Sequence, residues 1–274
     1  MVIRAAFDAC GVRFGSLFRR NRITDRRVDP AREPILNIPL VVVVLVALLG
    51  LIHALLTLVL TSEGATQFLL LFSFIPARYD ASVLPGGTLP GGIWAQIWTF
   101  VTHALIHADL NHLFFNCVWL LAFGTAVARR FGTVRFIAFF ALTSAAGAAA
   151  HLATHGGDFL PVVGASAGIS GAMAAAMRFV FAIGGPLGLL RAGNDDAYRL
   201  PAAPLRENLR DPRVLVFLGA WFGINLLVGI VGIGAFDQSV AWQAHIGGFL
   251  AGLLAFPLFD PVAAVRQSPP DASI

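Results

Sequence analysis

The chain alternates between long apolar runs and shorter polar connections. Runs of about 17 to 25 apolar residues are candidate transmembrane helices. Six such runs cover residues 36–60, 110–127, 134–152, 166–183, 214–232 and 240–259. The strands of a membrane barrel would instead alternate apolar and polar side chains over about ten residues. The pattern therefore predicts an all-α membrane protein in which six transmembrane helices form a bundle.

The composition agrees with this prediction. Hydrophobic residues make up 57% of the 274 residues and charged residues only 12%. Soluble domains are about one quarter charged, so this chain has too few charges to cover the surface of a soluble protein of its length. Disordered chains combine low hydrophobicity with high charge, and that class is excluded too. Cys10 and Cys117 have no metal-binding or redox spacing, so no disulfide framework is expected.

The arginines predict the orientation of the spans. All 19 basic residues are arginines. Every one except Arg78 falls in the N-terminal tail, in or beside the connections between spans two and three and between spans four and five, or after span six. The positive-inside rule then places both termini in the cytoplasm. The basic character is thus a topology signal, and no nucleic-acid partner is expected. Anionic lipids are the better partner for the N-terminal tail.

Three regions follow from these boundaries. They are an Arg-rich cytoplasmic tail at 1–35, a six-helix membrane domain at 36–260 and a short cytoplasmic tail at 261–274. Residues 61–107 are too many for a simple connection between spans and contain Trp94 and Trp98. We expect this segment to be a partly membrane-embedded loop on the outer face, with its tryptophans at the interface. The short loops suggest a bacterial cytoplasmic membrane.

Polar side chains lie near one end of the second, fourth and sixth spans. They are His107, His112, Asn116, Ser166 and His245. Polar groups inside a membrane are costly and are functional candidates by default. With a cytoplasmic N-terminus, these three spans all run from outside to inside. The side chains that begin them are therefore predicted to lie at similar depth below the outer surface.

The fourth span gives an expected depth for this cluster. Only 12 residues separate Ser166 from Arg178, which is about 18 Å of helix. The hydrocarbon core is about 30 Å thick. If Arg178 lies near the cytoplasmic interface, Ser166 lies about 10 Å below the outer surface. A polar helix start at that depth has to face protein or a water-filled cavity.

Small residues favour close packing of the fourth and sixth spans. Gly168 and Gly171 are positioned to meet Gly248 and Gly252, as in small-xxx-small helix contacts. Such contacts often do no more than pack helices. Here they would also bring Ser166 and His245 within reach of each other, because both side chains lie at the outer ends of these spans.

This cluster has the groups needed for nucleophilic catalysis. A serine hydroxyl is a poor nucleophile until a base such as neutral histidine takes its proton. The backbone N–H of Ser166 at a helix start, with the side chains of His112 and Asn116, can donate hydrogen bonds to an oxyanion. No Asp or Glu is placed to orient His245, so a Ser–His dyad is predicted. The chain has no His-Glu-x-x-His zinc motif.

Other polar residues have structural interpretations. His53 is expected to make an interhelical hydrogen bond, and Ser170 to bond a carbonyl of its own helix. Asp109 is predicted to cap the N-terminus of the second span. His151 and His155, four residues apart without a third ligand, are interpreted as an interfacial helix end.

These motifs resemble those of the rhomboid intramembrane serine proteases. The matching patterns are His107-x4-His112-x3-Asn116, Gly164-Ala165-Ser166 and Ala244-His245-x2-Gly248-x3-Gly252. The resemblance extends over residues 35–260, in the family's order. The chain departs from the usual family pattern where Thr99 follows Trp98 in place of Arg, where Ala167 follows the serine, at Ala128, and where Ser170 replaces a frequent aromatic residue.

The resemblance implies cleavage of peptide bonds in or near the transmembrane segments of substrate proteins, without metal or cofactor. It implies that Ser166 is the nucleophile and His245 the general base and acid. His112 and Asn116 would serve the oxyanion hole. His107 and Gly164 would have supporting roles next to the site.

Two other functions remain open on the sequence. The first is a non-catalytic membrane protein that holds or escorts transmembrane segments in the same cleft. The second is a transporter or channel, which is disfavoured because the sequence has no inverted repeat. The protease and the escort protein are separated by whether Ser166 reacts covalently.

Overall fold

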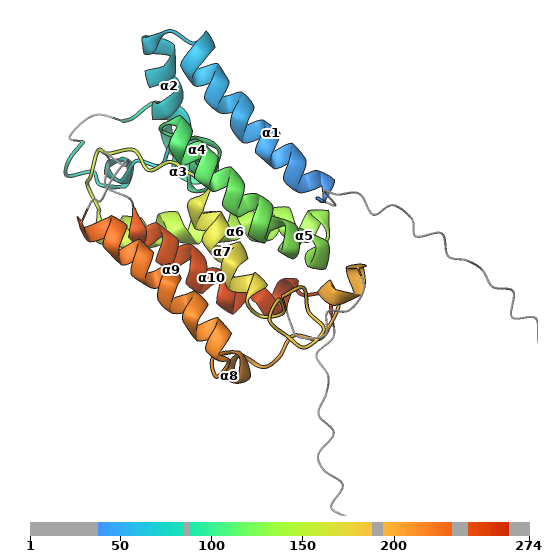
Figure 1. Ribbon diagram of the computed structural model, residues 1–274. Helices are drawn as coiled ribbons and strands as arrows, with labels where there is room; N and C mark the ends of the chain where they lie inside the picture. The colour runs from blue at the N-terminus through green and yellow to red at the C-terminus, as the bar shows by residue number, and fades with distance from the viewer. Residues whose placement is uncertain (1–37, 85–87, 188–193, 232–240, 263–274) are drawn as a thin grey trace, which may run out of the picture. The chain divides into compact units, whose positions relative to one another are not determined.

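The computed structural model describes residues 38–84, 88–187, 194–231 and 241–262 of the chain (Figure 1). The predicted N-terminal tail at 1–35 and residues 263–274 of the C-terminal tail lie outside this description. Within the described residues the fold is helical, and its sole β-type pairing is an isolated antiparallel bridge between Phe74 and Val162. The expected all-α class is confirmed.

Within the described residues, helices lie in all six predicted apolar runs, and three shorter helices lie in the connections between them. The helices are α1 (Leu40–Ala54), α2 (Ser62–Phe72), α3 (Gly92–Thr102), α4 (Leu110–Trp119), α5 (Thr125–Phe131), α6 (Thr133–Thr154), α7 (Ser166–Ala176), α8 (Leu205–Asn208), α9 (Pro212–Val231) and α10 (Trp242–Phe259). One π-helical turn, Leu55–Val59, extends α1, and another, Leu120–Gly124, joins α4 to α5.

Four helical segments of the described chain are long and apolar enough to cross a membrane. They are Leu40–Val59, Leu110–Phe131, Thr133–Thr154 and Trp242–Phe259. The described part of α9 contains a shorter apolar helix, Pro212–Leu227. An integral membrane protein is therefore supported, whereas six spans and cytoplasmic termini remain predictions.

The fourth predicted span is shorter than expected. The sequence predicted a helix over 166–183, but α7 has only 11 residues and ends at Ala176. Beyond it the backbone tightens into turns, with the Phe179 N–H bonded to the Ala176 carbonyl at 3.1 Å. Arg178 is buried and its guanidinium donates to the Ala203 carbonyl at 2.9 Å. The arginine therefore does not mark an exposed interface. Phe179 and Val180, which follow it in these turns, are also buried, whereas Ile183 is exposed.

Helix α7 lies at the centre of the membrane domain, in contact with α4, α5, α6 and α10 (Figure 1). Most of its residues are small, and every one from Ala167 to Ala176 is buried. A Cβ at Gly252 of α10 would lie 2.5 Å from the Gly171 Cα, and a Cβ at Gly248 would collide with the Ala167 carbonyl. The predicted contact of Gly171 with Gly252 is confirmed, whereas Gly168 instead faces Phe140 and Ser144 of α6.

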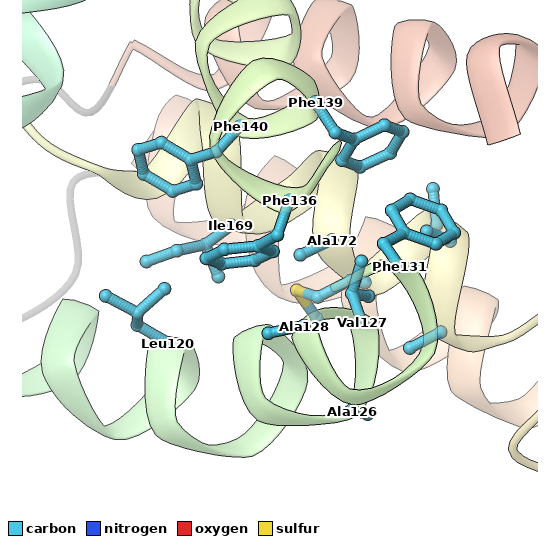
Figure 2. Packing of buried hydrophobic residues seen from close by; sticks show 14 of the residues in the cluster. Leu120, Ala126, Val127, Ala128, Phe131, Phe136, Phe139, Phe140, Ile169 and Ala172 are labelled. Carbon is cyan, nitrogen blue, oxygen red and sulfur yellow. The ribbon is translucent and has the colours of Figure 1, made fainter. Parts of the chain in front are cut away.

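Phenylalanines fill the space between α5, α6 and α7. Figure 2 shows the rings of Phe136 and Phe140 near Ile169 of α7, and those of Phe131 and Phe139 on the other side of the same cluster. Phe131 and Phe139 meet edge to face, with ring centroids 5.3 Å apart. Because α7 carries few large side chains, these rings from its neighbours set its lateral position.

Two buried arginines tie chain segments together. Arg130, at the end of α5, makes a two-pronged ion pair with Asp260 after α10, with both N–O distances 2.8 Å. The same guanidinium donates to the carbonyls of Tyr198 and Leu200 at 2.8 Å each. From the sequence alone, Arg130 was used only to predict the orientation of the spans. In the structure it also joins α5, the connection after α7 and the end of α10.

Arg78 has the corresponding role in the loop at 61–107. Its guanidinium donates to the carbonyls of Leu70 and Pro90, at 2.5 and 2.8 Å. The Trp98 indole N–H donates to the Leu71 carbonyl at 2.8 Å. The loop is thus a compact unit made of α2, a short turn of 3-10 helix at Pro76–Tyr79 and α3. Its insertion into the membrane remains a prediction.

Candidate active site

Ser166 is the first residue of α7 and is half-buried. The chain reaches it through Gly164, whose φ of +119° lies in a region that side chains other than glycine rarely adopt. A Cβ at this glycine would also lie 2.6 Å from Nε2 of His112. Glycine therefore lets the segment before Ser166 pass directly against the His112 imidazole. The first N–H groups of α7 have no partner within the helix.

His245 lies in the first turn of α10 and contacts Ser166. Its Nε2 is 2.7 Å from the Ser166 Oγ, a normal hydrogen-bond distance for a hydroxyl donor. The close approach of Gly248 to the Ala167 carbonyl, next to Ser166, brings the two helix ends together. The structure thus places the two side chains in the contact that the sequence predicted.

A third side chain, which the sequence reasoning missed, contacts His245. The Asn225 Oδ1 of α9 is 2.5 Å from the His245 Nδ1. The sequence search considered only Asp and Glu as orienting groups and therefore predicted a Ser–His pair alone. The available signal was an asparagine inside the otherwise apolar span at 214–232. The rotation of α9 that aims this side chain at His245 could not be read from the sequence.

His112 lies on α4 beside this site, and Asn116 lies one turn further along the same helix. Asp109 caps the helix as predicted, because its carboxylate accepts the His112 N–H at 2.8 Å. Asn116 is buried, and its Nδ2 donates to the His112 carbonyl at 2.9 Å. A side-chain amide has two N–H donors, so one remains for another acceptor. The His112 ring lies next to Gly164, whereas Asn116 is bonded along its own helix.

His107 supports the segment that leads into α7. It is buried, and its Nε2 accepts the Ala165 N–H at 3.4 Å. Its own carbonyl accepts a hydrogen bond from the His53 Nδ1 of α1 at 3.2 Å. His53 thus has the expected structural role, but its partner lies in the connection before α4 and not in a helix. Burial, with smaller effects of His112 and His53, lowers the pKa of His107 to about 3. His107 is therefore neutral and holds the backbone just before Ser166.

The other polar residues take the structural places expected of them. The Ser170 hydroxyl donates to the Ser166 carbonyl at 2.8 Å in its own helix. His151 and His155 stack at the end of α6, with ring centroids 4.3 Å apart. Within the described ranges there is no group of three or more His, Cys, Asp or Glu side chains arranged to hold a metal ion.

Comparison with known proteins identifies relatives of this chain. The chain is similar to the Rhomboid protease GlpG of Haemophilus influenzae, with 28% identity over 164 residues that make up 58% of this chain and 68% of that protein. Proteins of the same name from Yersinia pestis and Yersinia pseudotuberculosis are 26% identical over 161 residues, which are 59% of this chain and 48% of theirs. The chain thus spans about half the length of the Yersinia relatives.

A family match covers the whole candidate site. The Rhomboid domain matches residues 95–260, which are more than half of the 274 residues. This range contains His112, Asn116, Ser166 and His245, together with the Asn225 contact. The chain therefore belongs to the rhomboid family.

Proposed function

We propose that this protein is an intramembrane serine endopeptidase that cleaves peptide bonds in or near the transmembrane segments of other membrane proteins. The observation that carries the proposal is the 2.7 Å contact between the Ser166 Oγ and the His245 Nε2. A hydroxyl in this contact can lose its proton to the imidazole as it attacks a carbonyl carbon. The name of the relatives, Rhomboid protease, supports the same class of reaction.

The reaction proceeds in two stages. The Ser166 oxygen bonds to the carbonyl carbon of the scissile peptide while its proton passes to the His245 Nε2. The tetrahedral intermediate collapses, the C–N bond breaks, and His245 returns the proton to the departing amine. Water then attacks the acyl-enzyme with His245 again as base, which releases the new carboxyl end and restores the serine.

Three donors are assigned to the oxyanion of the tetrahedral intermediate. The backbone N–H of Ser166 lies at the positive end of α7, where a negative charge is stabilised. His112 and the remaining N–H of Asn116 supply side-chain donors. Gly164 lets the segment before Ser166 lie directly against the His112 imidazole, because a side chain at this position would collide with that ring. His107 fixes the preceding peptide through the Ala165 N–H.

The proposal includes a membrane setting. The six predicted spans and the distribution of the arginines favour a site toward the outer side of a bacterial cytoplasmic membrane. Hydrolysis needs water, so the pocket opens outward and is screened from lipid. A substrate helix has to unwind locally to expose a bond, which favours substrates with small, helix-breaking residues near the cleavage site.

The test separates a protease from a protein that only holds membrane segments. The purified full chain in detergent micelles is mixed with a single-span model substrate and, separately, with a serine-reactive phosphonate. We expect cleavage and labelling of Ser166, both lost in Ser166→Ala. The matched control is Ser170→Ala, one turn along the same helix, which should keep both. Folded protein that binds the substrate but is never labelled at Ser166 would instead be an escort protein.

A further inference from the structure

We infer that Asn225 is a positioning residue that holds His245 in the tautomer able to accept the Ser166 proton. This inference rests on the proposed function. It starts from the contact between the Asn225 Oδ1 and the His245 Nδ1, on the side of the imidazole away from Ser166. Both ring nitrogens of His245 therefore have a side-chain partner, and the partner of Nδ1 comes from a different helix.

The orientation of the Asn225 amide follows from its second contact. The Asn225 Nδ2 is 2.8 Å from the Trp221 carbonyl oxygen of its own helix. A carbonyl oxygen can only accept, so the amide NH2 has to face Trp221 and the amide oxygen has to face His245. The reversed amide would put two acceptors, the Asn225 Oδ1 and the Trp221 carbonyl, against each other.

The orientation of the amide in turn determines the proton on His245. The Asn225 oxygen carries no hydrogen, so the hydrogen bond exists only if the His245 Nδ1 is the protonated ring nitrogen. In neutral imidazole the other nitrogen, Nε2, then presents its lone pair. That lone pair faces the Ser166 hydroxyl at 2.7 Å. One consistent chain of hydrogen bonds therefore runs from Ser166 through His245 and Asn225 to the Trp221 carbonyl.

Aromatic packing between α9 and α10 sets the position of Asn225 along its helix relative to His245. The Trp221 ring of α9 stacks on Phe249 of α10, with centroids 4.6 Å apart. Phe222 meets the same ring edge to face, with centroids 5.7 Å apart. Phe249 lies one turn after His245, and Trp221 lies one turn before Asn225. The stacked rings thus fix the register at which the amide reaches the imidazole.

A neutral amide suits this position better than a carboxylate would. An unpaired carboxylate inside the membrane domain is costly, whereas an amide accepts the same N–H without a buried charge. Asparagine orients the catalytic histidine in some unrelated cysteine proteases for the same geometric reason. In this chain the frequent aromatic residue of the family is replaced by Ser170, whose hydroxyl is bonded to its own helix. The orienting contact to His245 comes instead from α9.

The first measurement reads the tautomer directly. Imidazole nitrogen NMR of the full chain in micelles, with isotope-labelled histidine and assignment by His245→Gln, distinguishes a protonated Nδ1 from a protonated Nε2. We expect neutral His245 to carry its proton on Nδ1 in the wild type. In Asn225→Leu, which keeps the side-chain volume but removes the acceptor, we expect a substantial population of the Nε2-protonated form.

The second measurement is kinetic. The rate of phosphonate labelling at Ser166 should fall roughly 10- to 100-fold in Asn225→Leu, less than the full contribution of a general base. With the model substrate the fall should appear in kcat rather than in KM. The matched control is Asn208→Leu, which removes another buried asparagine, bonded to the Met177 carbonyl at the opposite end of α7 from Ser166. It should leave the tautomer unchanged.

The outcomes separate the two proposals. If wild-type neutral His245 is protonated on Nε2, the assignment of Asn225 is wrong whatever the variants do. If Asn225→Leu keeps the wild-type tautomer and labels at the wild-type rate, the positioning role is also refuted while the protease proposal survives. If the folded wild type is not labelled at Ser166, the proposed function fails, and the NMR result still decides whether Asn225 orients His245.

Discussion

The close contact between α7 and α10 predicts that Gly252→Ala disturbs the site from a distance. The added Cβ would lie 2.5 Å from both the Cα and the carbonyl oxygen of Gly171. Carbon atoms pack at about 3.5–4.0 Å, so the two helices have to separate by about 1 Å. Overpacking of this kind costs about 1–3 kcal/mol of stability. A displacement of about 1 Å between Ser166 and His245, at the outer ends of the same helices, is expected to lower turnover by about 10²-fold.

Two assays and one control test this reasoning. The thermal unfolding midpoint in micelles measures the packing cost, and the rate of phosphonate labelling at Ser166 measures the displacement. Gly219→Ala on α9 is the control, because a Cβ there meets no atom within 4 Å. We expect the control to match the wild type in both assays. A Gly252→Ala protein with unchanged stability and labelling would mean that the helix contact does not set the distance between the two side chains.

Three further predictions concern parts of the structure outside the pair Ser166 and His245. Arg130→Met should lower the unfolding free energy by about 3–5 kcal/mol in denaturant titrations, because it leaves Asp260 buried without its partner; replacing both residues by apolar ones should recover most of the loss. Asp109→Ala should cost about 1 kcal/mol through loss of the cap on α4, and Asp109→Asn should cost less, as measured by thermal unfolding. Burial lowers the pKa of His107 to about 3, so the unfolded chain binds a proton here that the folded chain does not. Stability should therefore fall as the pH drops from about 6.5 toward 3, and His107→Gln should make that fall shallower; an identical pH profile would contradict the neutral assignment.

The approach of Ser166 to His245 could be predicted from the sequence because two independent patterns agreed. Alternate spans run in the same direction through the membrane, so both residues were predicted to lie at the outer ends of their helices. The glycines predicted a close crossing of the same two helices. Both arguments use only chain direction and residue size, which a sequence contains. The structure places the two side chains in contact.

The end of α7 and the contact of Asn225 could not be predicted in the same way. Hydropathy sums apolar character, and Phe179 is apolar whether it lies in a helix or in a buried turn. The burial of Arg178 depends on the Ala203 carbonyl, which arrives from a distant part of the chain. Asn225 was visible as a polar residue in a span, but its partner depends on how α9 is rotated against α10.

The burial of α7 beyond its first residue, Ser166, surrounds this helix with protein and not with lipid. All residues from Ala167 to Ala176 are enclosed by protein, whereas α1, for example, carries exposed apolar side chains such as Val44 and Leu51 along its length. A bilayer that is too thick or too thin therefore strains the outer helices, which tilt or deform to match it. We expect Ser166 to keep its surroundings in membranes of different thickness, because the rest of its helix is surrounded by protein.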